Sequence, residues 1–121
     1  MSIRKKKVLV VDDDPDILAF IQAMLEDEDY KVATIERSDR LKELTEGDVP
    51  NVIVLDMLLS GNDGRDITIQ LKSQENTKHI PIILLSAHPE AEREAKRVGA
   101  DAFLAKPFEM DELLALVARY A

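Results

Sequence analysis

The sequence predicts an α/β fold in which a parallel five-stranded sheet carries helices on both faces. Two observations support this fold class. The apolar runs at 8–11 and 52–55 are continuous and mostly β-branched, which is typical of strands buried on both faces of a parallel sheet. Strand-like and helix-like segments also alternate along the whole chain. Such alternation leads to a doubly wound sheet with right-handed crossovers.

The first three elements are a strand at 6–11, a helix at 15–28 and a short strand at 31–35. Asp14 and Pro15 form a good N-cap and first-turn pair for the helix. Apolar residues recur at helical spacing on one helix face. These inward positions are Ile17, Ile21, Met24 and Leu25.

The middle of the chain contains a helix at 38–46, a central strand at 51–55 and a helix at 64–73. Leu41 and Leu44 lie on one face of the first helix, which Gly47 and Pro50 end. The residues from 56 to 63 are expected to form a loop. The inward positions of the later helix are Ile67 and Leu71.

The last elements are strands at 82–85 and 102–104 and helices at 90–98 and 109–120. The helix at 90–98 ends at Gly99 and has small inward residues, so we expect it to be the least firmly anchored element. Its inward positions are Ala91, Ala95 and Val98. Those of the final helix are Met110, Leu113, Leu114 and Val117.

Composition limits the function classes. A chain of 121 residues with 45% apolar residues is expected to form one domain over 1–121, with no output domain. The absence of cysteine excludes disulfides, thiolate metal sites and cysteine nucleophiles. The basic start at 4–7 precedes only four apolar residues, too few for a signal peptide or membrane span, so we expect a cytoplasmic protein without a membrane partner. A net charge of −8 disfavours direct nucleic-acid binding.

Carboxylates follow two of the buried strands. Asp12 and Asp13 come after the first strand, and Asp56 comes after the central one. Because the carboxyl ends of parallel strands meet at one edge, these acids are expected to lie together and to need a cation. Oxygen-only ligands suit Mg²⁺, for which Mn²⁺ can substitute. Asp14 and Asp16 are interpreted as a helix cap and a surface acid.

Two further polar residues end later strands of the sheet. Ser86 follows 82–85, and Lys106 follows 103–105. A hydroxyl and an ammonium group beside the acids complete a set that can bind an anion. This combination favours phosphoryl chemistry.

Several motifs, in order, resemble the receiver domain of two-component response regulators. They are Val8-Leu9-Val10-Val11-Asp12-Asp13-Asp14-Pro15, Leu55-Asp56, Asp63-Gly64, Leu85-Ser86-Ala87, Gly99-Ala100-Asp101 and Lys106-Pro107-Phe108. The resemblance spans the whole chain. It implies a flavodoxin-like (βα)₅ three-layer sandwich with strand order 2-1-3-4-5.

The resemblance also implies a chemistry for the acids. Asp56 would be the phosphoacceptor, taking a phosphoryl group from a phosphohistidine on a sensor histidine kinase or a histidine phosphotransfer protein. Asp13 would bind Mg²⁺ directly, Asp12 directly or through a water, and Met57 through its backbone carbonyl. The chain would then be a signalling switch that catalyses its own phosphorylation and dephosphorylation, not an enzyme acting on other substrates.

The same resemblance implies how the switch reports phosphorylation. Lys106 would pair with Asp56 and later with the phosphoryl oxygens, through a cis Lys106–Pro107 bond. Ser86 would donate its hydroxyl to the phosphoryl group, and Phe103 would rotate inward in response. The surface at 90–120 would change and contact a downstream protein, a fused output domain or a second copy in a homodimer.

Some positions depart from the family pattern or have simpler interpretations. Ser60 stands where many relatives have proline, which leaves the loop looser. Leu58 and His88 occupy positions that influence the attack of water on the acyl phosphate in this family. His88 is also interpretable as an exposed residue, and His79 as a loop residue.

Three alternatives come from other classes. Asp12-Asp13-Asp14 contains the Asp-x-Asp of haloacid-dehalogenase-type phosphatases, but Asp16 stands where that family has threonine or valine. The alternation of Asp12, Asp14 and Asp16 resembles an EF-hand, but Ile17 and Ala23 replace its glycine and glutamate. The third alternative is a receiver-like docking module without phosphorylation.

Overall fold

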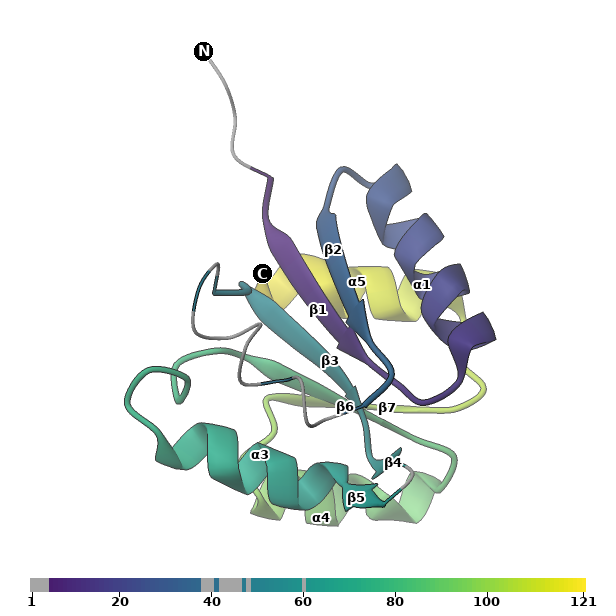
Figure 1. The fold of residues 1–121 in the computed structure, drawn as a ribbon. Helices are drawn as coiled ribbons and strands as arrows, with labels where there is room; N and C mark the ends of the chain where they lie inside the picture. Colours follow the sequence, from purple (N-terminus) through teal and green to yellow (C-terminus); the bar gives the residue numbers. More distant parts are fainter. Residues whose placement is uncertain (1–4, 38–40, 42–46, 48, 60) are drawn as a thin grey trace.

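The computed structural model describes residues 5–37, 41, 47, 49–59 and 61–121. Its centre is a parallel sheet of five strands in the order β2-β1-β3-β6-β7 (Figure 1). This order corresponds to the predicted 2-1-3-4-5, so the doubly wound fold class is confirmed. The strands are β1 (Lys7–Val11), β2 (Lys31–Ile35), β3 (Val52–Asp56), β6 (Ile82–Ser86) and β7 (Ala102–Ala105).

Helices cover both faces of this sheet (Figure 1). They are α1 (Pro15–Asp27), α3 (Gly64–Ser73), α4 (Glu92–Arg97) and α5 (Met110–Tyr120), with a short 3₁₀ helix, η2, at Pro89–Ala91. The helix predicted at 38–46 lies outside the described residues, apart from the buried Leu41. In the part of the chain described, no helix has the length and apolar run needed to cross a membrane.

The sheet separates two hydrophobic cores. Val8 and Val10 face the core formed with α1 and α5, whereas Leu9 and Val11 face the core formed with α3 and α4. This division follows from the alternation of side chains along a strand. Burial on both faces explains why β1, β3 and β6 are apolar without interruption up to the polar residues at their ends.

Helix α1 begins as predicted, because the Asp14 side chain accepts hydrogen bonds from the backbone N–H groups of Asp16 and Ile17. Its inward face is rotated slightly from the prediction. Leu18 is buried, whereas Ile17 and Met24 are only half-buried. The direction in which the helix packs on the sheet decides this rotation, and sequence spacing alone leaves it undefined.

Two local elements differ from the predictions. The expected loop at 56–63 contains a small antiparallel hairpin, β4 (Leu58–Leu59) with β5 (Asn62–Asp63). The expected helix at 90–98 is divided into η2 and the six-residue α4, and α4 itself buries only Ala95. Such short pieces lack the periodicity that identifies longer elements in a sequence.

Candidate functional site

The carboxyl ends of four neighbouring strands meet at one edge of the sheet. β1 pairs with β3, β3 with β6, and β6 with β7, all in parallel. Asp12 follows β1, Asp56 ends β3, Ser86 ends β6, and Lys106 follows β7. The topology thus brings together four of the predicted site residues from positions up to 94 residues apart in the sequence.

Three carboxylates form the acidic part of this site. Asp12, Asp13 and Asp56 each offer an oxygen, and these oxygens all lie within 4.8 Å of one another. Asp12 and Asp56 are buried, with exposed fractions of 1% and 8%, whereas Asp13 is exposed. Asp12 is held in place by the Asp14 backbone N–H, which donates to its Oδ1 at 3.0 Å. Like charges this close favour a compensating cation.

Lys106 supplies one such compensating charge. Its Nζ lies 3.1 Å from Asp12 Oδ2 and 3.4 Å from Asp56 Oδ2. The expected contact with Asp56 is therefore present, but the lysine is shared with Asp12, which the sequence did not predict. Burial opposes the charged form, yet hydrogen bonding to Asp12 and the charges of both acids outweigh it and raise the pKa of Lys106.

The electrostatic setting of Asp56 differs from that of an ordinary surface aspartate. Burial and the negative charge of Asp12 raise its pKa above the usual 3.8, and Lys106 and the Leu58 backbone N–H oppose that shift. A cation placed among the three carboxylates would act in the same direction as Lys106. It would favour the ionised, nucleophilic form of Asp56.

The donor set fits a hard divalent cation. Three carboxylates and one ammonium group leave a net charge of −2 at the site, and all three potential ligands are oxygen atoms. Met57, the other expected ligand, is 3% exposed, and its carbonyl accepts a hydrogen bond from the Gly64 N–H at 2.6 Å. A carbonyl oxygen has two lone pairs, so this hydrogen bond leaves one of them for a cation, and Met57 remains a predicted ligand beside the three carboxylates.

Ser86 ends β6, the strand that pairs with β3, and its side chain is buried. Its Oγ accepts a hydrogen bond from the His88 N–H at 3.0 Å, and the residue is 1% exposed. Its carbonyl accepts from the Lys106 N–H at 2.7 Å, which ties the ends of β6 and β7 together. The Lys106–Pro107 bond is cis, so this part of the prediction is confirmed.

Phe103 lies in β7, away from the carboxylates. It is half-buried and packs against the core under α3 and α4. It also lines a cavity of about 200 Å³ that reaches Ala95 in α4 and Tyr120 in α5. Phe103 thus lies between the core under α3 and α4 and the surface at 90–120 that is predicted to change.

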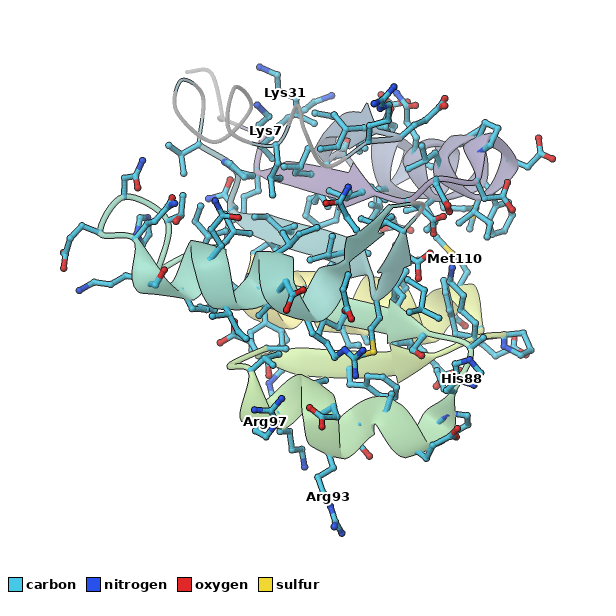
Figure 2. All side chains as sticks on the ribbon, turned by 60° about the horizontal axis from the view of Figure 1, so that its bottom comes forward. Lys7, Lys31, His88, Arg93, Arg97 and Met110 are labelled. Carbon is cyan, nitrogen blue, oxygen red and sulfur yellow. The ribbon has the colours of Figure 1, made fainter. Side chains whose placement is uncertain are left out.

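Three of the remaining predicted positions have exposed side chains. Leu58 is 53% exposed, and the His88 side chain is 58% exposed with Nδ1 lying 3.6 Å from Glu90. Figure 2 shows His88 near the outer edge of the molecule. His79 is exposed, and Ser60 lies outside the described residues.

Two residues quoted only as parts of motifs have structural roles that the sequence did not reveal. Gly64 packs so closely on β3 that a Cβ atom would lie 2.6 Å from the Asp56 carbonyl oxygen. Asp101 Oδ2 accepts hydrogen bonds from Lys72 Nζ and the Ile82 N–H, both at 2.8 Å. The Asp101 contacts join segments 29 and 19 residues apart in the sequence. Gly64 is close to Asp56 in the sequence, but its contact depends on how the start of α3 packs against the end of β3.

Comparison with known proteins gives consistent matches. A family model described as "Response regulator receiver domain" matches residues 8–118. The phosphate regulon transcriptional regulatory protein PhoB of Pseudomonas aeruginosa is 35% identical over 112 residues, covering 91% of this chain and 49% of that protein. The transcriptional regulatory protein PrrA of Mycobacterium tuberculosis is 35% identical over 119 residues, covering 96% of this chain and 50% of that protein. The chain thus spans about half the length of these curated relatives.

Solved structures show the same similarity. Chemotaxis protein CheY4 of Vibrio cholerae superposes with a TM-score of 0.87 at 30% identity, covering 98% of this chain and all of that one. The receiver domain of the sensor histidine kinase PA1611 from Pseudomonas aeruginosa has a TM-score of 0.85 at 28% identity, covering 97% and 98%. That structure contains a magnesium ion coordinated in its active site cleft.

Proposed function

This chain belongs to the response regulator receiver domain family, and we propose that it is a phosphorylation-activated switch whose phosphoacceptor is Asp56. Receiver domains of two-component response regulators act in phosphorylation-dependent signalling. The observation that carries the specific proposal is the position of Asp56. It is the last residue of the central strand, buried beside Asp12, with Lys106 within 3.4 Å.

In the proposed reaction, a carboxylate oxygen of Asp56 attacks the phosphorus atom of a phosphohistidine. An O–P bond forms, the P–N bond breaks, and the imidazole of the sensor kinase or histidine phosphotransfer protein leaves. The product is an aspartyl phosphate. Hydrolysis of this acyl phosphate by water returns the Asp56 carboxylate and inorganic phosphate.

The cation site and Lys106 supply the electrostatic part of this proposal. Asp12, Asp13 and Asp56 would hold Mg²⁺, which when bound neutralises charge on the carboxylates and on the phosphoryl group. Lys106 donates to phosphoryl oxygens once Asp56 is modified, because its Nζ is already within 3.4 Å of the Asp56 carboxylate. Both effects lower the repulsion between an anionic nucleophile and an anionic donor.

Ser86 and Phe103 are the proposed reporters of phosphorylation. The Ser86 hydroxyl accepts from the His88 N–H, so its own hydrogen is the part that can donate to a phosphoryl oxygen. Movement of Ser86 toward the phosphoryl group changes the packing of Phe103 and of the cavity beside α4. The surface formed by α4, β7 and α5 then favours a downstream protein or a fused output domain.

Intact-mass measurement after incubation with acetyl phosphate tests the proposal. With Mg²⁺ present, the protein is expected to gain the mass of one phosphoryl group, and chelation of the metal should prevent this. Asp56→Asn should gain none, because its amide lacks the anionic oxygen. The matched control is Asp14→Asn, which removes a charge near the site but keeps a good helix cap. Absence of an adduct contradicts the proposal and favours a docking module. An unchanged adduct in Asp56→Asn also contradicts the proposal, because the phosphoryl group must then be on another residue.

A further inference from the structure

A cleft of about 950 Å³ lies at the end of the sheet opposite the acidic site. Its lining includes residues at the start of β1, at the connection from α1 to β2, and just before β3. Lys7 begins β1 and Asp12 follows it, so the two ends are roughly 16 Å apart along the strand. The cleft is therefore separate from the phosphorylation site and needs its own explanation.

Positive charge gathers in this cleft on an otherwise acidic molecule. Lys5, Lys6, Lys7 and Lys31 line it, and among the described lining residues only Glu26 is acidic. The chain has 16 basic and 24 acidic side chains, so without these four lysines and Glu26 the rest of the chain has 12 basic and 23 acidic side chains, a net charge of −11. The cleft is thus the place where an anion is attracted rather than repelled.

Lys7 and Lys31 form the centre of the positive group. They are register partners on the parallel strands β1 and β2, so their side chains leave the same face of the sheet from neighbouring positions. Figure 2 shows the two side chains near each other at the same end of the molecule. Both have partners within the chain, and Lys7 is only 9% exposed.

The other side chains that line the cleft can contact the uncharged part of a ligand. Tyr30 is half-buried, and Val32 and Val49 add apolar surface beside it. Asn51 Oδ1 accepts a hydrogen bond from the Lys7 N–H at 2.8 Å, so its NH₂ group is the end that can donate to a ligand. An aromatic ring, an amide donor and several lysines together favour a ligand with both a flat ring and phosphate groups.

We propose that this cleft binds a nucleoside polyphosphate, with its phosphates among the lysines and its base against Tyr30. The volume lies within the range of about 300–1,000 Å³ that small-molecule sites occupy. A long nucleic acid is disfavoured, because it would extend beyond the lysines of the cleft on a chain whose net charge is −8, and surface charges act over about 8 Å in physiological salt. The proposal does not depend on the chemistry of Asp56.

Binding of ATP to the full chain, measured by calorimetry in low salt with EDTA, tests this inference. Lys5→Gln/Lys31→Gln removes two exposed lysines and should preserve the fold, whereas Lys7 is buried and is left intact. This variant is expected to bind ATP at least about tenfold more weakly, since a charge-assisted hydrogen bond contributes about that factor. Lys78→Gln/Lys96→Gln, which changes the net charge equally at exposed positions outside the cleft, should bind within about twofold of the parent.

Further measurements distinguish the ligand classes. Amide NMR shifts on adding ATP should centre on Tyr30 and Asn51 and leave Asp12 and Asp56 unchanged. Tripolyphosphate should bind several-fold more weakly than ATP, because it lacks the base that contacts Tyr30. Four results would overturn the proposal: no saturable binding at millimolar ATP, equal binding of tripolyphosphate, tighter binding of a single-stranded DNA oligonucleotide, or equal weakening in both double variants.

Discussion

Replacing Gly64 by alanine is expected to disturb the proposed phosphorylation site without touching any of its functional side chains. Gly64 begins α3 and packs directly on the end of β3. A Cβ atom there would lie 2.6 Å from the Asp56 carbonyl oxygen, 2.8 Å from Met57 Cα and 3.1 Å from the Met57 carbonyl oxygen. All three atoms belong to the backbone, so no side-chain rotation can make room.

The size of the effect follows from these distances. Non-bonded heavy atoms are comfortable at about 3.5–4.0 Å, so α3 and β3 must separate by roughly 0.7–1 Å. Overpacking of this kind costs about 1–3 kcal/mol, and weakening the 2.6 Å hydrogen bond from Gly64 N to Met57 O adds about 1 kcal/mol. The better helix propensity of alanine returns up to about 1 kcal/mol. We expect a net loss of about 2 kcal/mol in the free energy of unfolding, or roughly 8 °C in Tm.

The same displacement should slow phosphorylation, because Asp56 is the residue whose backbone is pushed. A misplacement of about 1 Å can reduce a reaction rate roughly 100-fold. Since α3 and β3 share the movement, we expect a reduction of about tenfold or more. Thermal unfolding gives the stability change, and the rate of adduct formation with acetyl phosphate and Mg²⁺ gives the effect on the site.

Gly47→Ala is the matched control for this experiment. Gly47 is exposed, and a Cβ there has no atom within 4 Å. Its stability should change by less than about 0.5 kcal/mol, and its phosphorylation rate should equal that of the parent. If Gly64→Ala behaved like Gly47→Ala in both measurements, the reasoning from close backbone contact would be wrong.

Two further predictions concern groups outside the site. Asp101→Ala should lower the free energy of unfolding by about 1–3 kcal/mol, because Lys72 and the Ile82 N–H lose their shared acceptor, while the phosphorylation rate stays unchanged. Unchanged thermal stability, or slower phosphorylation, would contradict this. The hydrogen bond from Arg65 holds the pKa of Asp63 below its usual 3.8. The ionised Asp63 therefore stabilises the folded state above pH 3.8, and this stabilisation disappears as the pH falls through the pKa of Asp63 in the folded protein. Asp63→Asn should therefore be less stable than the parent at pH 7, with the difference in unfolding free energy shrinking in strong acid; a difference independent of pH would refute it.

The strands and their topology could be predicted because their causes are local. A strand buried on both faces is apolar along its length except at its ends, so β1, β3 and β6 are recognisable without any knowledge of their neighbours. Strict alternation with helices then leaves few possible topologies. The acids at the ends of β1 and β3 could be placed together for the same reason, since the carboxyl ends of parallel strands share one edge.

Details of packing could not be predicted in this way. The spacing in α1 identifies an apolar face, but only the contact with the sheet decides that Leu18 is buried more deeply than Ile17. Similarly, the hairpin of β4 and β5 has only two residues in each strand, too few for a periodic pattern.

The sequence by itself determined the fold class, the strand edge at which the acids collect and the family to which the chain belongs. Only the tertiary structure decided that Lys106 is shared by Asp12 and Asp56, that Gly64 lies against the backbone of Asp56, and that four lysines border one cleft. The physical reason is the range of the interactions involved. Burial and periodicity act on neighbouring residues, whereas ion pairs, close backbone contacts and charge clusters depend on how separate strands and helices pack together.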